Sequence, residues 1–219
     1  MKYSGFLFDL DGTLVDSLPA VERAWSNWGA RHGIAAQEVL SFIHGKQAIT
    51  SLRHFMAGKS EAEIQAEYLA LEQNEAADTD GIKALPGARS LLARLNELAI
   101  PWAIVTSGSV PVAHARHLAA DLPLPAVFIT AEQVAKGKPE PDPYLLGAKK
   151  LGLNAEECVV VEDAPAGILS GLNAHCAVVA VNAPAGAPRL AETLLQLRSL
   201  DALVVTKLNE GGFSLSVKG

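Results

Sequence analysis

Short, strongly apolar segments alternate with longer stretches of helical periodicity along most of this chain. The apolar segments are rich in β-branched residues and occupy residues 5–8, 102–106, 127–130, 158–161 and 177–181, with a further one at 203–205. Because they are apolar on both faces, they are typical of parallel strands that helices cover on either side. Strands that alternate with helices predict an α/β fold with a doubly wound, Rossmann-like parallel sheet.

One long stretch breaks this alternation. Residues 16–82 contain helical patterns and no good strand. Ser17 followed by Pro19 indicates the start of a helix, and Ser60-Glu61-Ala62-Glu63 has the pattern of a capping box. We therefore expect two units: a core formed by residues 1–15 and 83–219, and an all-helical cap of residues 16–82 inserted directly after the first strand.

Composition limits the classes of function. With 49% hydrophobic residues, the 219-residue chain can bury a core. Its net charge of −6 argues against general nucleic-acid binding but allows a small phosphorylated substrate. Asp9 interrupts the N-terminal apolar run, and no segment has the length of a membrane span. Cys158 and Cys176 are expected to be buried thiols. We expect a cytoplasmic monomer without membrane or nucleic-acid partners.

Two carboxylates follow the first apolar segment, in Asp9-Leu10-Asp11-Gly12-Thr13. Residues i and i+2 of a strand point to the same side, so Asp9 and Asp11 can converge on one substrate or share one metal ion. The motif could also be a turn or the start of a calcium loop. The calcium register fails, because Leu14 stands where that loop needs glycine and Ala20 where it needs glutamate.

Three further polar segments follow predicted strands. In doubly wound sheets, ligands bind beyond the carboxyl ends of the strands, so we expect these segments to gather near Asp9. They are Thr106-Ser107-Gly108, Lys138 within Gly137-Lys138-Pro139-Glu140-Pro141, and Glu162-Asp163 leading into Ala164-Pro165-Ala166-Gly167. Thr106 and Ser107 could also cap the next helix, and Glu162-Asp163 could be an acidic helix start.

The order of these four motifs resembles the haloacid dehalogenase superfamily, and the resemblance covers essentially the whole chain. The helical insertion after the first motif is similar to that of its phosphatases with a small helical cap. Residues 6–17 and 43–48 are similar to segments of the bacterial sugar-phosphate and hexitol-phosphate phosphatases of this group. The resemblance implies a Mg²⁺-dependent phosphatase that hydrolyses small sugar or hexitol phosphates through an aspartyl-phosphate intermediate.

The resemblance also implies a role for each motif residue. Asp9 is the expected nucleophile, and Asp11 the expected acid and base. Lys138 is expected to neutralise the charge of the phosphoryl group and to orient Asp9. Thr106, with backbone amides near Ser107, is expected to hold the phosphoryl group.

The same resemblance implies a metal site. Asp9, Asp163 and the backbone carbonyl of Asp11 are the expected ligands, and Glu162 is expected to act directly or through water. The motifs contain carboxylates but no histidine or cysteine, a donor set that suits Mg²⁺ better than Zn²⁺.

The expected cap contains a basic segment. Residues 39–60 include no Asp or Glu but do include His44, Lys46, Arg53, His54 and Lys59. Lys46 is our first candidate for contact with the substrate and His44 the second. A solvated helix face is an equally good interpretation of the segment as a whole. Trp25 and Trp28 are expected to pack in the core or hinge, although Trp25 could line the cleft.

Two alternatives to a phosphatase remain: a phosphosugar mutase and a non-catalytic phosphosugar sensor. Related mutases typically carry a histidine early in the first cap helix, where this chain has Val21, and tend to have valine at the position of Thr13. Both residues therefore favour hydrolysis. A dehalogenase is less favoured, because Asp11 is superfluous for that chemistry.

Overall fold

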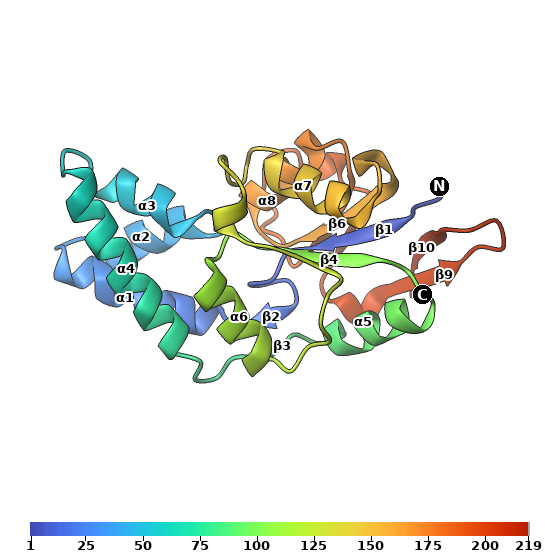
Figure 1. The fold of residues 1–219 in the computed structure, drawn as a ribbon, viewed down its shortest axis with the longest axis horizontal. Helices are drawn as coiled ribbons and strands as arrows, with labels where there is room; N and C mark the ends of the chain where they lie inside the picture. The colour runs from blue at the N-terminus through green and yellow to red at the C-terminus, as the bar shows by residue number, and fades with distance from the viewer. Residues whose placement is uncertain (219) are drawn as a thin grey trace.

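The computed structural model describes residues 1–218 and contains a parallel sheet of six strands in the order β5-β4-β1-β6-β7-β8 (Figure 1). The chain leaves β1 for β4 and β5 on one side, then returns to build β6, β7 and β8 on the other. The doubly wound α/β prediction is confirmed. The strands are β1 (Gly5–Phe8), β4 (Trp102–Val105), β5 (Val127–Ile129), β6 (Cys158–Glu162), β7 (Ala177–Val181) and β8 (Leu195–Leu197).

Helices cover both faces of this sheet. Successive β1 side chains enter opposite cores: Phe6 and Phe8 face one cluster, and Leu7 faces the other. This arrangement explains why the strands are apolar on both faces. In Figure 1, α7 and α8 lie above the sheet, and α5 and α6 lie below it. These helices are α5 (Ala88–Glu97), α6 (Val110–Ala119), α7 (Asp142–Leu151) and α8 (Pro165–Asn173), with short 3₁₀ turns η1 (Ala131–Gln133), η2 (Ala155–Glu157), η3 (Leu190–Glu192) and η4 (Leu200–Ala202).

Four helices form a separate bundle at one end of the molecule (Figure 1, left). They are α1 (Leu18–Arg31), α2 (Ala36–Ile43), α3 (Ala48–Phe55) and α4 (Glu61–Ala77). They share their own hydrophobic cluster, which includes Trp25, Trp28 and Leu71. The predicted capping box at the start of α4 is present, with the Ser60 hydroxyl accepting from the Glu63 backbone N–H.

Two short strands join the bundle to the sheet. β2 (Val15–Asp16) and β3 (Lys83–Ala84) pair antiparallel, so the chain enters and leaves the bundle at one place. We therefore propose residues 16–82 as the bounds of the cap. Besides these linkers, α4 contacts α6 of the core along its C-terminal part.

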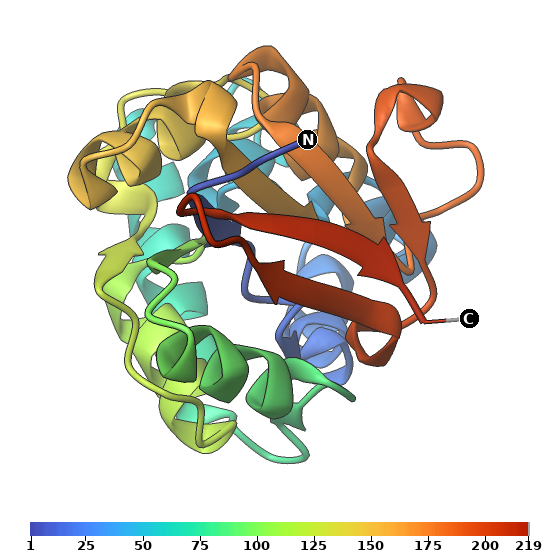
Figure 2. The ribbon, with the colours of Figure 1, turned by 90° about the vertical axis from the view of Figure 1, so that its right-hand side faces the viewer.

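The C-terminal segment differs from the sequence prediction. Residues 203–205 do form a strand, but β9 (Leu203–Lys207) pairs antiparallel with β10 (Phe213–Val217) outside the main sheet. Figure 2 shows this hairpin beside the N-terminal segment. Tyr3 and Phe213 exchange backbone hydrogen bonds of 2.9 and 2.8 Å. Neither β8 nor β10 was predicted, because short or half-exposed strands have no continuous apolar run.

We predict that Phe213→Ala will lower the free energy of unfolding by about 3–5 kcal/mol, the usual cost of removing a buried aromatic ring. Phe213 is fully buried, and its ring stacks on Phe6 with centroids 4.6 Å apart. Urea unfolding measures the loss. Val217→Ala, on the same strand but 45% exposed, is the control and should change stability little. Equal losses in both variants would contradict a core role for the hairpin.

Candidate active site

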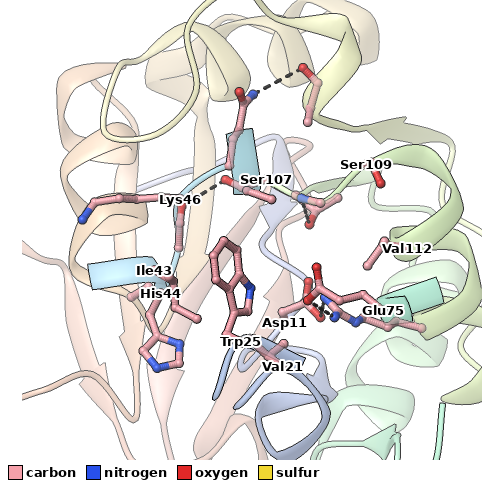
Figure 3. A pocket seen from close by; sticks show the side chains of 18 of the residues that line it. Asp11, Val21, Trp25, Ile43, His44, Lys46, Glu75, Ser107, Ser109 and Val112 are labelled. Carbon is pink, nitrogen blue, oxygen red and sulfur yellow. Dashed lines mark hydrogen bonds and ion pairs between the residues drawn. The ribbon is translucent and has the colours of Figure 1, made fainter. Parts of the chain in front are cut away.

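A pocket lies between the carboxyl edge of the sheet and the cap helices (Figure 3). The core contributes the predicted residues Asp9, Asp11, Thr106, Ser107 and Asp163 to its lining, and the cap contributes His44 and Lys46. The structure thus brings residues from distant parts of the sequence to one cavity, at the place where a doubly wound sheet binds ligands.

Asp9 stands directly after β1, where its backbone N–H still bonds to Val161 of β6 at 3.0 Å. Only 6% of the residue is exposed. Its Oδ1 accepts from Lys138 Nζ at 2.8 Å, and its Oδ2 accepts from Thr13 Oγ1 at 3.1 Å. Burial and the negative charge of Glu162 raise the pKa of Asp9 to about 7, against the opposing effect of Lys138.

Lys138 reaches the site from the loop that follows β5 and is 3% exposed. Its ammonium donates to Asp9 Oδ1 at 2.8 Å, to Glu162 Oε1 at 2.7 Å and to the Val105 carbonyl at 3.0 Å. Burial alone would lower the pKa of this ammonium, but the two carboxylates raise it above its ordinary value. The group is therefore a fixed positive charge beside Asp9.

Glu162, the last residue of β6, is fully buried. Its Oε1 accepts from Lys138 and from the Tyr144 hydroxyl at 2.8 Å. Its Oε2 accepts from the backbone N–H groups of Asp163 at 3.1 Å and Ala164 at 3.2 Å. Gly167 packs so closely against this carboxylate that a Cβ there would collide with it. These contacts make Glu162 an anchor for Lys138 and for the turn that carries Asp163.

Three carboxylates could hold a metal ion together. Oxygens of Asp9, Glu162 and Asp163 all lie within 4.8 Å of one another. Burial, followed by the charges of Asp9 and Glu162, raises the pKa of Asp163 well above its ordinary value. Such crowding of hard oxygen donors fits a divalent cation, which would relieve the repulsion. The Asp11 carboxylate lies outside this group of three. The metal ligand that the family resemblance implies for Asp11 is therefore its backbone carbonyl.

The Asp11 side chain contacts residues that sequence reasoning did not identify. Its Oδ1 accepts from Ser17 Oγ at 2.5 Å and from Arg116 Nη1 at 3.1 Å. Arg116 also donates to Glu75 Oε1 at 2.9 Å. Ser17, expected only as a helix start, makes no side-chain bond to the helix backbone. The sequence contains one signal for these contacts, the hydroxyl of Ser17 six residues after Asp11. Arg116 and Glu75 belong to none of the sequence motifs.

Thr106 and Ser107 line the pocket at the end of β4. Thr106 Oγ1 accepts from the Gly108 backbone N–H at 3.1 Å, which fixes the turn. Ser107 Oγ donates to the carbonyl of Gly45 in the cap at 3.0 Å. The helix α6 begins instead after Ser109, so the interpretation of Thr106-Ser107 as its cap is wrong.

The basic segment of the cap divides between the pocket and the surface. Lys46 and His44 line the pocket, but Lys46 Nζ donates to the Phe42 carbonyl at 2.6 Å and lies 3.6 Å from the centre of the Phe42 ring. In Figure 3, Lys46 and Asp11 lie on opposite sides of Trp25, which also lines the pocket. Burial lowers the pKa values of both Lys46 and His44.

The other basic residues of this segment lie outside the pocket. Arg53 and Lys59 form exposed ion pairs with Glu61 and Glu63. The His54 ring stacks on Phe42. Only part of the segment can therefore meet a ligand.

This combination of a doubly wound sheet, an inserted helical bundle and a carboxylate–lysine cluster defines a class of hydrolase. Residues 3–175 match the haloacid dehalogenase-like hydrolases, and the chain belongs to that family. It is 70% identical over 211 residues to hexitol phosphatase A of Escherichia coli K12, a match that covers 96% of this chain and 98% of that enzyme. Hydrolases of this family use a divalent metal ion, which the carboxylate group described above fits.

Solved structures have the same fold. A hydrolase from Pseudomonas syringae is 28% identical, with a TM-score of 0.81, over 90% of this chain and 94% of that one. A β-phosphoglucomutase from Clostridium difficile is 23% identical, with a TM-score of 0.78, over 91% of this chain and 92% of that one. The second likeness is evidence for the fold alone.

Two further expectations can be compared with the structure. Cys158 and Cys176 are both free and buried, as predicted. No helix within residues 1–218 is both long enough and apolar enough to cross a membrane.

We predict that a divalent metal ion will stabilise the folded protein by relieving repulsion among Asp9, Glu162 and Asp163. At about 100 times its Kd, the ion should add about 2.7 kcal/mol, a rise in Tm of roughly 5–10 °C for a chain of this size. Thermal unfolding with Mg²⁺ or EDTA measures the shift.

Asp163→Asn should remove most of this metal-dependent shift while leaving the metal-free protein at least as stable as the wild type, because it removes one of the crowded charges. Asp121→Asn is the matched control, since the Asp121 side chain is 86% exposed and lies outside the carboxylate group. An undiminished shift in Asp163→Asn would contradict the site.

Proposed function

We propose that this chain is a Mg²⁺-dependent phosphomonoesterase that hydrolyses small sugar or hexitol phosphates through an aspartyl-phosphate intermediate. The observation that carries the proposal is the buried Asp9 carboxylate, held between Lys138 and Thr13 and facing a pocket closed by the cap. The 70% identity to hexitol phosphatase A supports the same reaction and the same class of substrate.

The first step requires Asp9 Oδ to attack phosphorus while the leaving alcohol departs. Thr13 and Lys138 each hold one oxygen of this carboxylate, which fixes the direction of attack. Lys138 places positive charge where a phosphate dianion would otherwise be repelled by the anionic nucleophile. Asp11 would give its proton to the leaving oxygen and then take a proton from the water that hydrolyses the phosphoenzyme.

The metal and the phosphoryl group would share the remaining donors. Asp9, Asp163 and the backbone carbonyl of Asp11 would hold Mg²⁺, with Glu162 contributing directly or through water. The bound ion would neutralise charge on the phosphoryl oxygens. Thr106 and the backbone N–H groups near Ser107 would contact the phosphoryl group, which agrees with their place in the pocket lining.

Two residues favour hydrolysis over phosphoryl return to the substrate. Thr13 Oγ1 lies 3.1 Å from both Asp9 Oδ2 and Asp163 Oδ1, so its single proton is shared between the nucleophile and a proposed metal ligand. Val21 lines the pocket where the related mutases carry a histidine. The structural likeness to a phosphoglucomutase rests on the fold and gives the mutase alternative little support.

The non-catalytic alternative is also disfavoured. A sensor needs to bind a phosphosugar but has no need for a buried nucleophile between Lys138 and Thr13 or for a second carboxylate in the same pocket. A small phosphorylated sugar or polyol as the partner agrees with the pocket lining. The expectations of a cytoplasmic monomer without nucleic-acid or membrane partners stay predictions from the sequence.

We predict that Asp9→Asn will lower kcat for a hexitol phosphate by at least about 10³-fold, in keeping with the loss of nucleophiles in other enzymes. Phosphate release is measured over a panel of sugar and polyol phosphates with Mg²⁺ and with EDTA. Asp121→Asn controls for the loss of a carboxylate elsewhere and should keep wild-type turnover. Undiminished turnover in Asp9→Asn would show that another group is the nucleophile.

We predict that Lys46→Ala will change the ranking of substrates more than it changes turnover of a generic aryl phosphate, because Lys46 lines the side of the pocket away from Asp11 and its ammonium can turn from the Phe42 carbonyl to a bound substrate. A loss of about tenfold on the preferred substrate is expected for one hydrogen bond to a charged group. Lys59→Ala is the matched control, since Lys59 pairs with Glu63 outside the pocket. Equal losses on all substrates would count against a role in specificity.

A further inference from the structure

Arg116 connects the cap to the carboxylate proposed to transfer protons. It lies in the last turn of α6 and is 4% exposed. Its Nη1 donates to Asp11 Oδ1 at 3.1 Å, and its Nη2 donates to Glu75 Oε1 at 2.9 Å. Glu75 belongs to the last turns of α4, so one buried guanidinium joins residues from both units. Figure 3 labels the two carboxylates that it joins, Asp11 and Glu75.

We infer that Arg116, held in place by Glu75, is a positioning residue that fixes the Asp11 carboxylate for proton transfer. This inference rests on the function proposed above. On this inference, proton transfer by Asp11 depends on the docking of cap helix α4 against core helix α6.

The arrangement of the Asp11 oxygens supports the inference. Both Arg116 and Ser17 donate to Oδ1. Among residues 1–218, no hydrogen bond reaches Oδ2. The Asp11 side chain is 20% exposed and lines the pocket. One oxygen is thus held by the protein, and the other is left for the oxygen of a leaving group or a water molecule.

The chemistry of arginine suits this task. Its planar guanidinium offers donors in a rigid fork, so bonds to two carboxylates at once fix its orientation. A lysine would have to reach both carboxylates from a single nitrogen on a flexible chain, so it would hold Asp11 less firmly than the two nitrogens of the guanidinium do.

Glu75 gives Arg116 a second counter-charge besides Asp11. Only 7% of Glu75 is exposed. Burial raises the pKa of Glu75, and the Arg116 charge opposes that effect. An unpaired guanidinium at this depth would be costly. Because Glu75 supplies a permanent partner, Arg116 can stay in place while Asp11 exchanges its proton.

Two other roles for Arg116 must be distinguished. The ion pair could serve folding alone. Alternatively, Arg116 could bind a substrate hydroxyl, since it lines the pocket and its buried Nε has no partner among the described residues. Positioning of the acid predicts a dependence on the leaving group that neither of these roles predicts.

The test compares kcat/KM for phenyl, para-nitrophenyl and dinitrophenyl phosphates, which have similar shapes but leaving groups of increasing acidity. kcat/KM reports the steps up to departure of the leaving group, and a proton donor matters most for the poorest one. We expect Arg116→Gln to lose about 10²-fold on phenyl phosphate, the lower range for general acid catalysis, and far less on dinitrophenyl phosphate.

Asp11→Asn should make kcat/KM depend on the acidity of the leaving group as steeply as Arg116→Gln does. The double variant Asp11→Asn/Arg116→Gln should show no steeper dependence, because the two residues act as one unit. Arg116→Lys should restore part of the loss. Arg94→Gln is the matched control, since Arg94 pairs with Glu97 on the exposed surface of α5 and should leave the series unchanged.

Several outcomes would overturn the inference. An equal loss across the aryl series would indicate a structural role, and a loss confined to hexitol phosphates would indicate a contact with the substrate. If Arg116→Gln does not fold because Glu75 loses its partner, the double variant Glu75→Gln/Arg116→Gln is used instead, because it replaces both charges by amides. The inference requires this double variant to show the same steeper dependence of kcat/KM on the acidity of the leaving group. A wild-type protein that releases phosphate from none of these compounds would overturn the proposed function itself.

Discussion

The buried ammonium of Lys138 is the interaction on which the rest of the site depends. It lies among the ends of three strands and bonds to Asp9 after β1, to Glu162 at the end of β6 and to the Val105 carbonyl at the end of β4. Buried carboxylates are costly unless they are paired, so this single charge allows Asp9 and Glu162 to lie together inside the protein. A bound divalent cation would favour the ionised form of all three carboxylates, Asp163 included, because three negative charges beside one ammonium leave two for the cation to balance.

The cap limits the contact of the site with water. An open sheet edge exposes its carboxylates to water, which weakens electrostatic interactions with a phosphate. The four-helix bundle covers that edge and brings its own side chains to the pocket. Contacts between the units include polar, directional ones, such as Ser107 to the Gly45 carbonyl and Arg116 to Glu75. Docking of the cap can thus affect both the walls of the pocket and the group proposed to move protons.

Prediction from the sequence succeeded where a local pattern carries the information. Residues 5–8, buried on both faces, could hardly be anything but a central strand, and the motif residues then had to lie at its carboxyl end. It failed where pairing depends on distant segments. β10 is half-exposed and pairs with β9 and Tyr3, so its own residues give no strong signal. Glu75 looks like one more acidic residue on an acidic helix, yet it is buried against a partner 41 residues away.

The sequence by itself determined the alternation of strands and helices, the place of the inserted helices and the identity of the motif residues Asp9, Thr106, Lys138 and Asp163. The strands, the helices and the insertion follow from periodicity along the chain, and the motif residues follow from the family resemblance that their order carries. Only the tertiary structure decided which groups hold the carboxylates of the site. Tyr144 anchors Glu162, Thr13 bridges two carboxylates, and Arg116 with Glu75 holds Asp11. The physical reason is that such contacts depend on how α4, α6 and α7 pack, and packing of distant segments leaves no pattern in the neighbouring sequence.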